Sequence, residues 1–73
     1  MSLIKKIKSI PPEQRGDYLL SCETLKDRED TPLYRVSLIN DKENEIVDDF
    51  DYYDASDMEA DVQLADELGV AEI

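Results

Sequence analysis

The stretch LYRVSLI at residues 33–39 predicts a β-strand with one buried and one solvent-facing side. Its apolar and polar side chains alternate: Tyr34, Val36 and Leu38 against Arg35 and Ser37. Because successive side chains of a strand point to opposite faces of a sheet, this pattern indicates one covered face. The rest of the chain has to supply the neighbours of this strand and the layer that covers it.

One further strand is expected on each side of this segment. The first is Asp17–Leu25 (DYLLSCETL), where the side chains again alternate, and the other is Glu45–Tyr53 (EIVDDFDYY). Charged residues 26–32 form a loop before the central strand, and the sequence NDKEN at 40–44 is typical of a hairpin turn after it. The three strands predict an antiparallel β-meander.

The third strand does not keep a clean alternation beyond Val47. If the period of two continued, Ile46, Phe50 and Tyr52 would share a face with the charged Asp48. Either a β-bulge or an end of the strand near Asp48 would resolve this conflict.

A short amphipathic helix is expected at Ser2–Ile10 (SLIKKIKSI). Its two faces differ sharply in character: Leu3, Ile4, Ile7 and Ile10 lie on one, and Lys5, Lys6 and Lys8 on the other. Pro11 disfavours a helical conformation at the residue before it, so the helix ends there. Because so short a helix is not stable alone in water, its isoleucine face must pack on the rest of the domain.

A second helix is expected between Ser56 and Gly69. Ser56 followed by Glu59 is a capping-box pattern, and a glycine such as Gly69 commonly ends a helix. The apolar positions between them form one arc: Met58, Val62, Leu64, Ala65 and Leu68. Asp61 falls inside this arc, so it lies either in solvent at the sheet edge or against a base such as Arg35. The residues after Gly69 either fray or join a longer packing element.

Together these elements predict a single small α+β domain covering residues 1–73. It has a short N-terminal helix, a three-stranded antiparallel β-meander and a C-terminal helix packed on the sheet. A domain of 73 residues has a small core and a thin stability margin.

The net charge of −11 is concentrated in the second half of the chain. Residues 41–73 hold thirteen acids and one base, a net of −12, whereas residues 1–40 hold six acids and seven bases, a net of +1. A segment with so much unbalanced charge repels itself and costs folding stability. A basic surface on a partner protein is the simplest reason for keeping it.

No catalytic residue, cofactor or metal ligand is expected. The chain contains no histidine, which is the commonest general base, and its two glycines are too few for a glycine-rich phosphate-binding loop. The aspartates between Asp48 and Asp57 are crowded, but they lack the alternate spacing and the glycine of a calcium-binding loop. We therefore expect a protein that is not an enzyme.

Direct binding to nucleic acid is not expected, because phosphate contacts require a basic protein surface. An anionic membrane would also repel the chain, and no apolar run approaches the length of about 20 residues that a membrane helix needs. Cys22 is the only cysteine, so no intramolecular disulfide can form. A reducing, cytoplasmic compartment and a small buried thiol are expected.

The acidic segment 41–73 is the candidate binding site. Eight of its thirteen acids are aspartates, whose short side chains hold the charge close to the backbone in a fixed array. The predicted partner-binding residues are Asp48, Asp49, Asp51, Tyr52, Tyr53, Asp54, Asp57, Glu59, Asp66 and Glu67. The tyrosines, with Phe50, would add anchoring area. The alternative is that the acids are only solvated and the tyrosines belong to the core.

In element order and charge, the whole chain resembles the small acidic inhibitors encoded by phages and other mobile elements. These include anti-CRISPR proteins and other DNA mimics. The resemblance implies a protein that occupies the nucleic-acid groove of a nuclease (such as a CRISPR effector), a polymerase or a repressor. The lysine-rich first helix departs from a uniformly acidic mimic and would have to lie away from the contact surface.

The leading hypothesis is a non-enzymatic inhibitor or regulator, a monomer or homodimer, whose acidic half occupies a basic cleft of a nucleic-acid-binding protein. The alternative is a small adaptor or accessory subunit that binds a partner protein or a second copy through apolar faces. In that case the acidity serves solubility.

Overall fold

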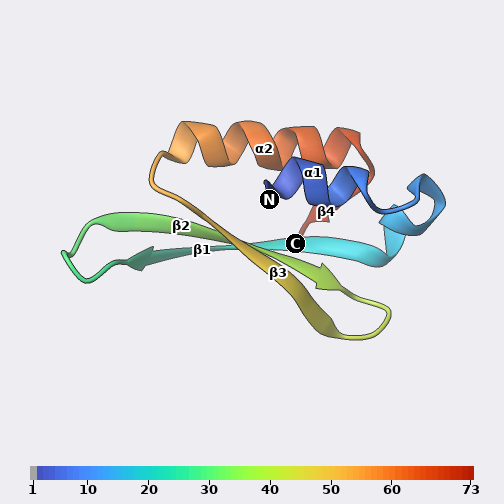
Figure 1. The fold of residues 1–73 in the computed structure, drawn as a ribbon, viewed down its shortest axis with the longest axis horizontal. Coiled ribbons are helices and arrows are strands. Elements are labelled where there is room, and N and C mark those ends of the chain that lie inside the picture. The colour runs from blue at the N-terminus through green and yellow to red at the C-terminus, as the bar shows by residue number, and fades with distance from the viewer. Residues whose placement is uncertain (1) are drawn as a thin grey trace.

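The computed structural model describes residues 2–73 and shows an α+β fold in which two helices cover one face of a four-stranded sheet (Figure 1). The elements follow in the order α1 (Leu3–Lys8), a 3₁₀ helix η1 (Pro12–Asp17), β1 (Tyr18–Lys26), β2 (Pro32–Asn40), β3 (Glu45–Tyr52), α2 (Ala55–Glu67) and β4 (Ala71–Glu72). The predicted α+β class is confirmed. The sheet and the start of the second helix differ from the prediction.

Helix α1 forms where the amphipathic pattern predicts it. The Ser2 hydroxyl oxygen accepts a hydrogen bond from the Lys5 backbone N–H at 3.2 Å and caps the first turn. Leu3 and Ile7 have no exposed surface, and Ile10, just beyond the helix, retains only 7%. The tertiary packing of these side chains therefore holds a helix that is too short to persist alone.

Strands β1, β2 and β3 form the expected antiparallel meander. The pairs Leu20–Leu38 and Cys22–Val36 lie opposite each other, with their side chains toward the helices. The ladder between β2 and β3 contains a register shift, because Leu38 pairs with Asp48 while Ile39 pairs with Ile46. Of the two alternatives predicted for the broken alternation near Asp48, a β-bulge or an end of the strand, the structure has the bulge.

Val47 is the extra residue of this bulge, and it packs against the hydrophobic core. Asp48, the next residue, is exposed at the edge of the sheet. The bulge thus lets an apolar side chain reach the core without forcing the neighbouring carboxylate into it.

The predicted three-stranded sheet is corrected by a fourth strand. The strand order is β3-β2-β1-β4, and β4 runs parallel to β1, with Ala71 opposite Leu19 and Glu72 opposite Leu20. Val70 is fully buried, and its backbone N–H donates to the Ala65 carbonyl at 2.9 Å. The residues after Gly69 therefore return under α2 to the sheet instead of fraying.

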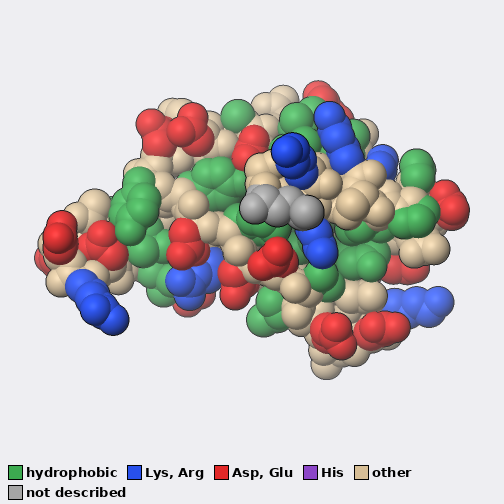
Figure 2. Space-filling model, in the orientation of Figure 1, with side chains coloured by type: hydrophobic (Ala, Val, Ile, Leu, Met, Phe, Trp, Pro, Cys, Tyr) green, Lys and Arg blue, Asp and Glu red, His purple; other side chains and the backbone are tan. Residues whose placement is uncertain are grey.

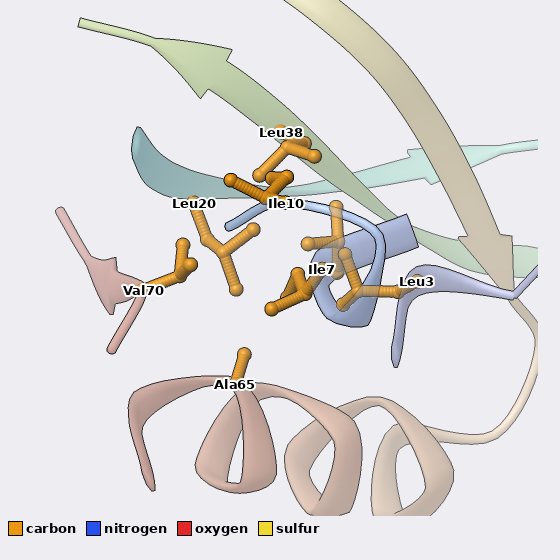
Figure 3. Close-up of a cluster of buried hydrophobic side chains, with 8 residues drawn as sticks. Leu3, Ile7, Ile10, Leu20, Leu38, Ala65 and Val70 are labelled. Carbon is orange, nitrogen blue, oxygen red and sulfur yellow. The ribbon is translucent and has the colours of Figure 1, made fainter. Parts of the chain in front are cut away.

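The core lies between the sheet and the two helices (Figure 3). Its fully buried large side chains come from α1, the central strands and the segment before β4: Leu3, Ile7, Leu20, Val36, Leu38 and Val70. From α2 only Ala65 is fully buried, with Met58, Val62 and Leu68 partly buried against the cluster. All of these side chains lie on one side of the sheet.

Helix α2 begins before the predicted capping box. Its N-cap is Asp54, whose carboxylate accepts hydrogen bonds from the backbone N–H groups of Ser56 at 2.7 Å and Asp57 at 3.4 Å. Ser56 thus lies within the first turn, and the Ser56–Glu59 capping box is wrong. An aspartate serves as N-cap as well as serine does, and its charge also suits the positive end of the helix dipole.

The C-terminal end of α2 is held by Arg15 of η1. The Arg15 guanidinium donates to the Leu68 carbonyl at 3.4 Å and to the Ile10 carbonyl at 3.1 Å. Gly69 follows with φ +104°, which turns the chain toward β4.

Among residues 2–73, neither helix is long and apolar enough to cross a membrane.

We predict that Gly69→Ala destabilises the protein by about 1–3 kcal/mol, because residues with a side chain rarely adopt the positive φ found at this position. A new Cβ at Gly69 would meet the Arg15 Cβ at 3.5 Å, an ordinary contact, so the cost is conformational. The matched control is Gly16→Ala, which has no atom within 4 Å of its Cβ and should be neutral or slightly stabilising. Urea unfolding measures both variants, and equal stabilities would contradict the role of Gly69.

Candidate protein-binding surface

The ten predicted binding residues do not form one continuous face. Asp49 and Asp51 lie on the face of the sheet opposite the helices, and Asp48 lies at its edge on β3. Tyr52 points toward the helix layer, and Tyr53 and Asp54 form the connection to α2. The other four lie on α2: Asp57, Glu59, Asp66 and Glu67, all of them exposed.

Two of the four acids of β3 accept hydrogen bonds from side chains of the neighbouring strand β2. Arg35 donates two hydrogen bonds to Asp51, from Nε to Oδ1 at 2.8 Å and from the terminal nitrogen to Oδ2 at 3.2 Å. This contact lowers the pKa of the Asp51 carboxyl. The Ser37 hydroxyl donates to Asp49 Oδ1 at 2.6 Å. Two of the predicted carboxylates, Asp49 and Asp51, are thus held by hydrogen bonds from β2.

Asp61 contacts a tyrosine, which corrects both readings of this residue. It is partly buried, and its Oδ2 accepts a hydrogen bond from the Tyr52 hydroxyl at 2.7 Å. Burial, followed by the effect of Asp61, raises the pKa of the Tyr52 hydroxyl. Arg35, the partner suggested by the sequence, lies on the opposite face of the sheet and is paired with Asp51.

The three aromatic residues predicted to anchor a partner differ in how much of their surface is exposed. Phe50 and Tyr52 are partly buried against the core, and the Tyr52 hydroxyl is already bonded to Asp61. Tyr53 is 62% exposed, and the negative charge of Asp27 raises the pKa of its hydroxyl. Of the three aromatic residues considered, Tyr53 is the one that offers most of its surface to a partner.

Helix α2 carries acids at a place where they weaken it. Asp57 lies in the first turn, where a negative charge suits the helix dipole. Asp66 and Glu67 lie at the other end, where the dipole is unfavourable to them, and the last turn of α2 contains no base of its own. Arg15 supplies the nearby positive charge from η1.

Few of the acids in 41–73 have a cationic partner. Among residues 2–73 the ion pairs are Arg35–Asp51 and Lys26–Asp30, so Asp51 is the one acid of this segment that is paired. Figure 2 shows acidic side chains over the start of α2, acidic and basic ones together at both hairpin turns, and a group of basic ones over α1. Because α1 lies beside α2 (Figure 1), the helix layer is mixed in charge.

Strand β3 carries the most uniformly acidic surface. We define the acidic edge as Glu45, Asp48, Asp49, Asp51 and Asp54, from the edge strand β3 and the residue that caps α2. All five are exposed, and no lysine belongs to β3 or to the connection after it. A partner that approached this edge from the sheet side would avoid the lysines of α1.

No pocket is present among residues 2–73, and no group of three or more acidic or cysteine side chains there is placed to hold a metal ion. The candidate site is an exposed surface. The sequence matches no protein-family model, and neither a curated protein nor a solved structure is significantly similar to it.

Cys22 lies on the helix-facing side of β1 and is partly buried. Burial, followed by a hydrogen bond and the negative charge of Glu72, raises the pKa of the thiol from 9.0 to about 11. The thiolate fraction at neutral pH is therefore about a hundredfold lower than in an ordinary cysteine, which makes Cys22 a poor nucleophile.

We expect iodoacetamide to alkylate Cys22 about a hundredfold more slowly in the native protein than in urea, at about pH 8. Glu72→Gln should accelerate the native reaction, because it removes the charge that β4 places beside the thiol. Glu67→Gln, on exposed α2, is the matched control and should change nothing. Mass spectrometry measures the rates. Equal rates in the native and unfolded protein would contradict the burial of Cys22, and an unchanged native rate in Glu72→Gln would contradict the placement of Glu72 on β4 beside the thiol.

We predict that Asp51→Asn lowers the thermal midpoint more at pH 7 than at about pH 3, which lies below the ordinary pKa of 3.8. The folded-state pKa of Asp51 lies below its ordinary value of 3.8, so its contribution to stability is present above that pH and is lost as the pH falls through the lower value. Glu45→Gln removes a carboxylate from the same strand without breaking an ion pair. Calorimetry at both pH values tests this, and equal effects of the two variants would contradict it.

Proposed function

We propose that this protein is a non-enzymatic inhibitor or regulator that binds the basic, nucleic-acid-binding surface of a partner protein through its acidic edge. The observation that carries the proposal is the set of unpaired acids. Twelve of the thirteen acids in 41–73 have no ion-pair partner among residues 2–73. Such a surface attracts a basic protein over a distance and speeds their encounter, and salt weakens this effect.

The arrangement of the acids supports recognition over simple solvation. Asp49 is held in place by the Ser37 hydroxyl, so it loses little freedom when a partner binds. Asp66 and Glu67 are kept where they oppose the dipole of α2, which costs stability. Fixed charges and charges that cost stability are both expected when a surface is selected for binding.

The density of exposed negative charge along α2 is of the same order as that of one nucleic-acid strand. Four of its 13 residues are exposed acids, and at about 1.5 Å per residue this is roughly one charge per 5 Å. A single strand of duplex DNA carries one charge per about 3.4 Å of axis. This similarity supports competition with nucleic acid as the mode of action, with β3 and α2 meeting at Asp54.

The proposal is tested by capturing partners from a nuclease-treated lysate of the native host. We expect basic nucleic-acid-binding proteins to be retained at low salt and released by duplex DNA or RNA. Neutralising the acidic edge with Glu45→Gln, Asp48→Asn and Asp49→Asn should weaken retention at least tenfold. The asparagines keep an oxygen acceptor for the existing hydrogen bonds.

The matched control neutralises three exposed acids of the first half: Glu13→Gln, Asp17→Asn and Glu29→Gln. It changes the net charge equally, so its retention should fall much less. The proposal would be contradicted by a captured protein that nucleic acid does not release and that the acidic-edge variant retains as well as the wild type does. It would favour the adaptor alternative, in which apolar surface carries the binding.

A further inference from the structure

The face of the sheet opposite the helices has no covering layer among residues 2–73 (Figure 1). Its residues form rows across the strands, because residues that pair in register share a face. One row is apolar across all four strands: Ala71, Leu19, Ile39 and Ile46. We call it the apolar row.

The apolar row is open to solvent at both ends. Ile46, on the edge strand β3, is 61% exposed. At the other end Ala71 is exposed, and Ile73, which follows β4, is 76% exposed. Leu19 and Ile39 lie between them and are partly exposed. A contiguous exposed apolar surface of this kind is typical of an interaction site.

The next row along the strands is polar and acidic. It consists of Ser21, Ser37 and Asp49, and the row beyond it of Glu23, Arg35 and Asp51. Arg35 is the one base in these rows, and Asp51 already neutralises it. Asp49 and Glu23 have no ion-pair partner among residues 2–73, so the surface beside the apolar row is negative.

We propose that this uncovered face is the docking surface, and that its occupant is a basic amphipathic helix of the partner protein. This inference rests on the proposed function and specifies which part of the partner is bound. The acids beside the apolar row require basic side chains next to an apolar stripe. A second copy of this chain does not meet that requirement, because each copy carries a net charge of −11 and would repel the other.

The spacing of the row fits a helix. Neighbouring strands lie about 4.8 Å apart, and apolar residues along one face of a helix recur at about 5 Å, every three or four residues. An apolar helical stripe lying across the strands therefore places one side chain over each strand. The acidic row lies about 7 Å away, within the width of such a helix, so lysine or arginine on its flank reaches Asp49.

The test uses the full chain, labelled with ¹⁵N and on its methyl groups, and an 18-residue helical peptide of leucine and lysine with one apolar stripe. One control peptide has the same composition in scrambled order, and another has glutamate in place of lysine. We expect the amphipathic basic peptide to bind, and both controls to bind at least tenfold more weakly. Shift changes should centre on Leu19, Ile39, Ile46 and Ile73.

Two variants separate the apolar and the acidic parts of the surface. Ile46→Ser should weaken peptide binding about tenfold and leave its salt dependence unchanged, since it removes apolar contact alone. Asp49→Asn should weaken binding and reduce the salt dependence. Leu64→Ser, an apolar residue of α2 that is 38% exposed, is the matched control and should bind as the wild type does.

Shift changes confined to α2, or equal binding of the scrambled peptide, would overturn the inference. A dimer at micromolar concentration that Ile46→Ser dissociates, seen by sedimentation equilibrium, would overturn it too, because the occupant would then be a second copy. Failure here is distinguishable from failure of the proposed function. Suppose that DNA displaces a captured partner and that this partner binds the Ile46→Ser variant as tightly as the wild type. This result would contradict the docking surface and leave the proposed function standing.

Discussion

The structure depends on the packing of two helices against one face of the sheet. Leu3 and Ile7 of α1, Leu20 of β1 and Ala65 of α2 meet in a single cluster without exposed surface. Apart from Leu33, all the buried apolar side chains of residues 2–73 belong to this cluster. The opposite face of the sheet is consequently left to solvent or to a partner, and the distribution of functional features follows from this one-sided core.

Much of this fold can be predicted from the sequence, because the side-chain period of a strand and the apolar arc of a helix are local patterns. The strand around Val36 and helix α1 follow from them directly. The fourth strand leaves no such pattern, since two residues cannot show an alternation. The buried Val70 becomes understandable only when α2 carries the chain back to Ala71 beside β1. The start of α2 is ambiguous for another reason, because Asp54 and Ser56 are both good N-caps.

The candidate surface was less predictable than the fold. The sequence identifies the acids, but not which of them share a face, because the bulge at Val47 changes the register between Ile46 and Asp48. The side-chain type of the tyrosines predicts anchors for a partner, whereas in the structure the Tyr52 hydroxyl bonds to Asp61. The apolar row could not be found from sequence alone. It requires the pairing of Leu19 with Ile39 and with Ala71, which are far apart along the chain.

The apolar row and the acidic edge are best understood together. An exposed edge strand next to isoleucines is liable to pair with another copy of the chain. The carboxylates of β3 oppose that pairing, since they bring like charges together where Ile46 is exposed. Under the proposed function, the same carboxylates would attract a basic partner to the same place. On this proposal, one arrangement of charge would both oppose self-pairing and favour an oppositely charged protein, while the apolar row would supply contact that salt does not weaken.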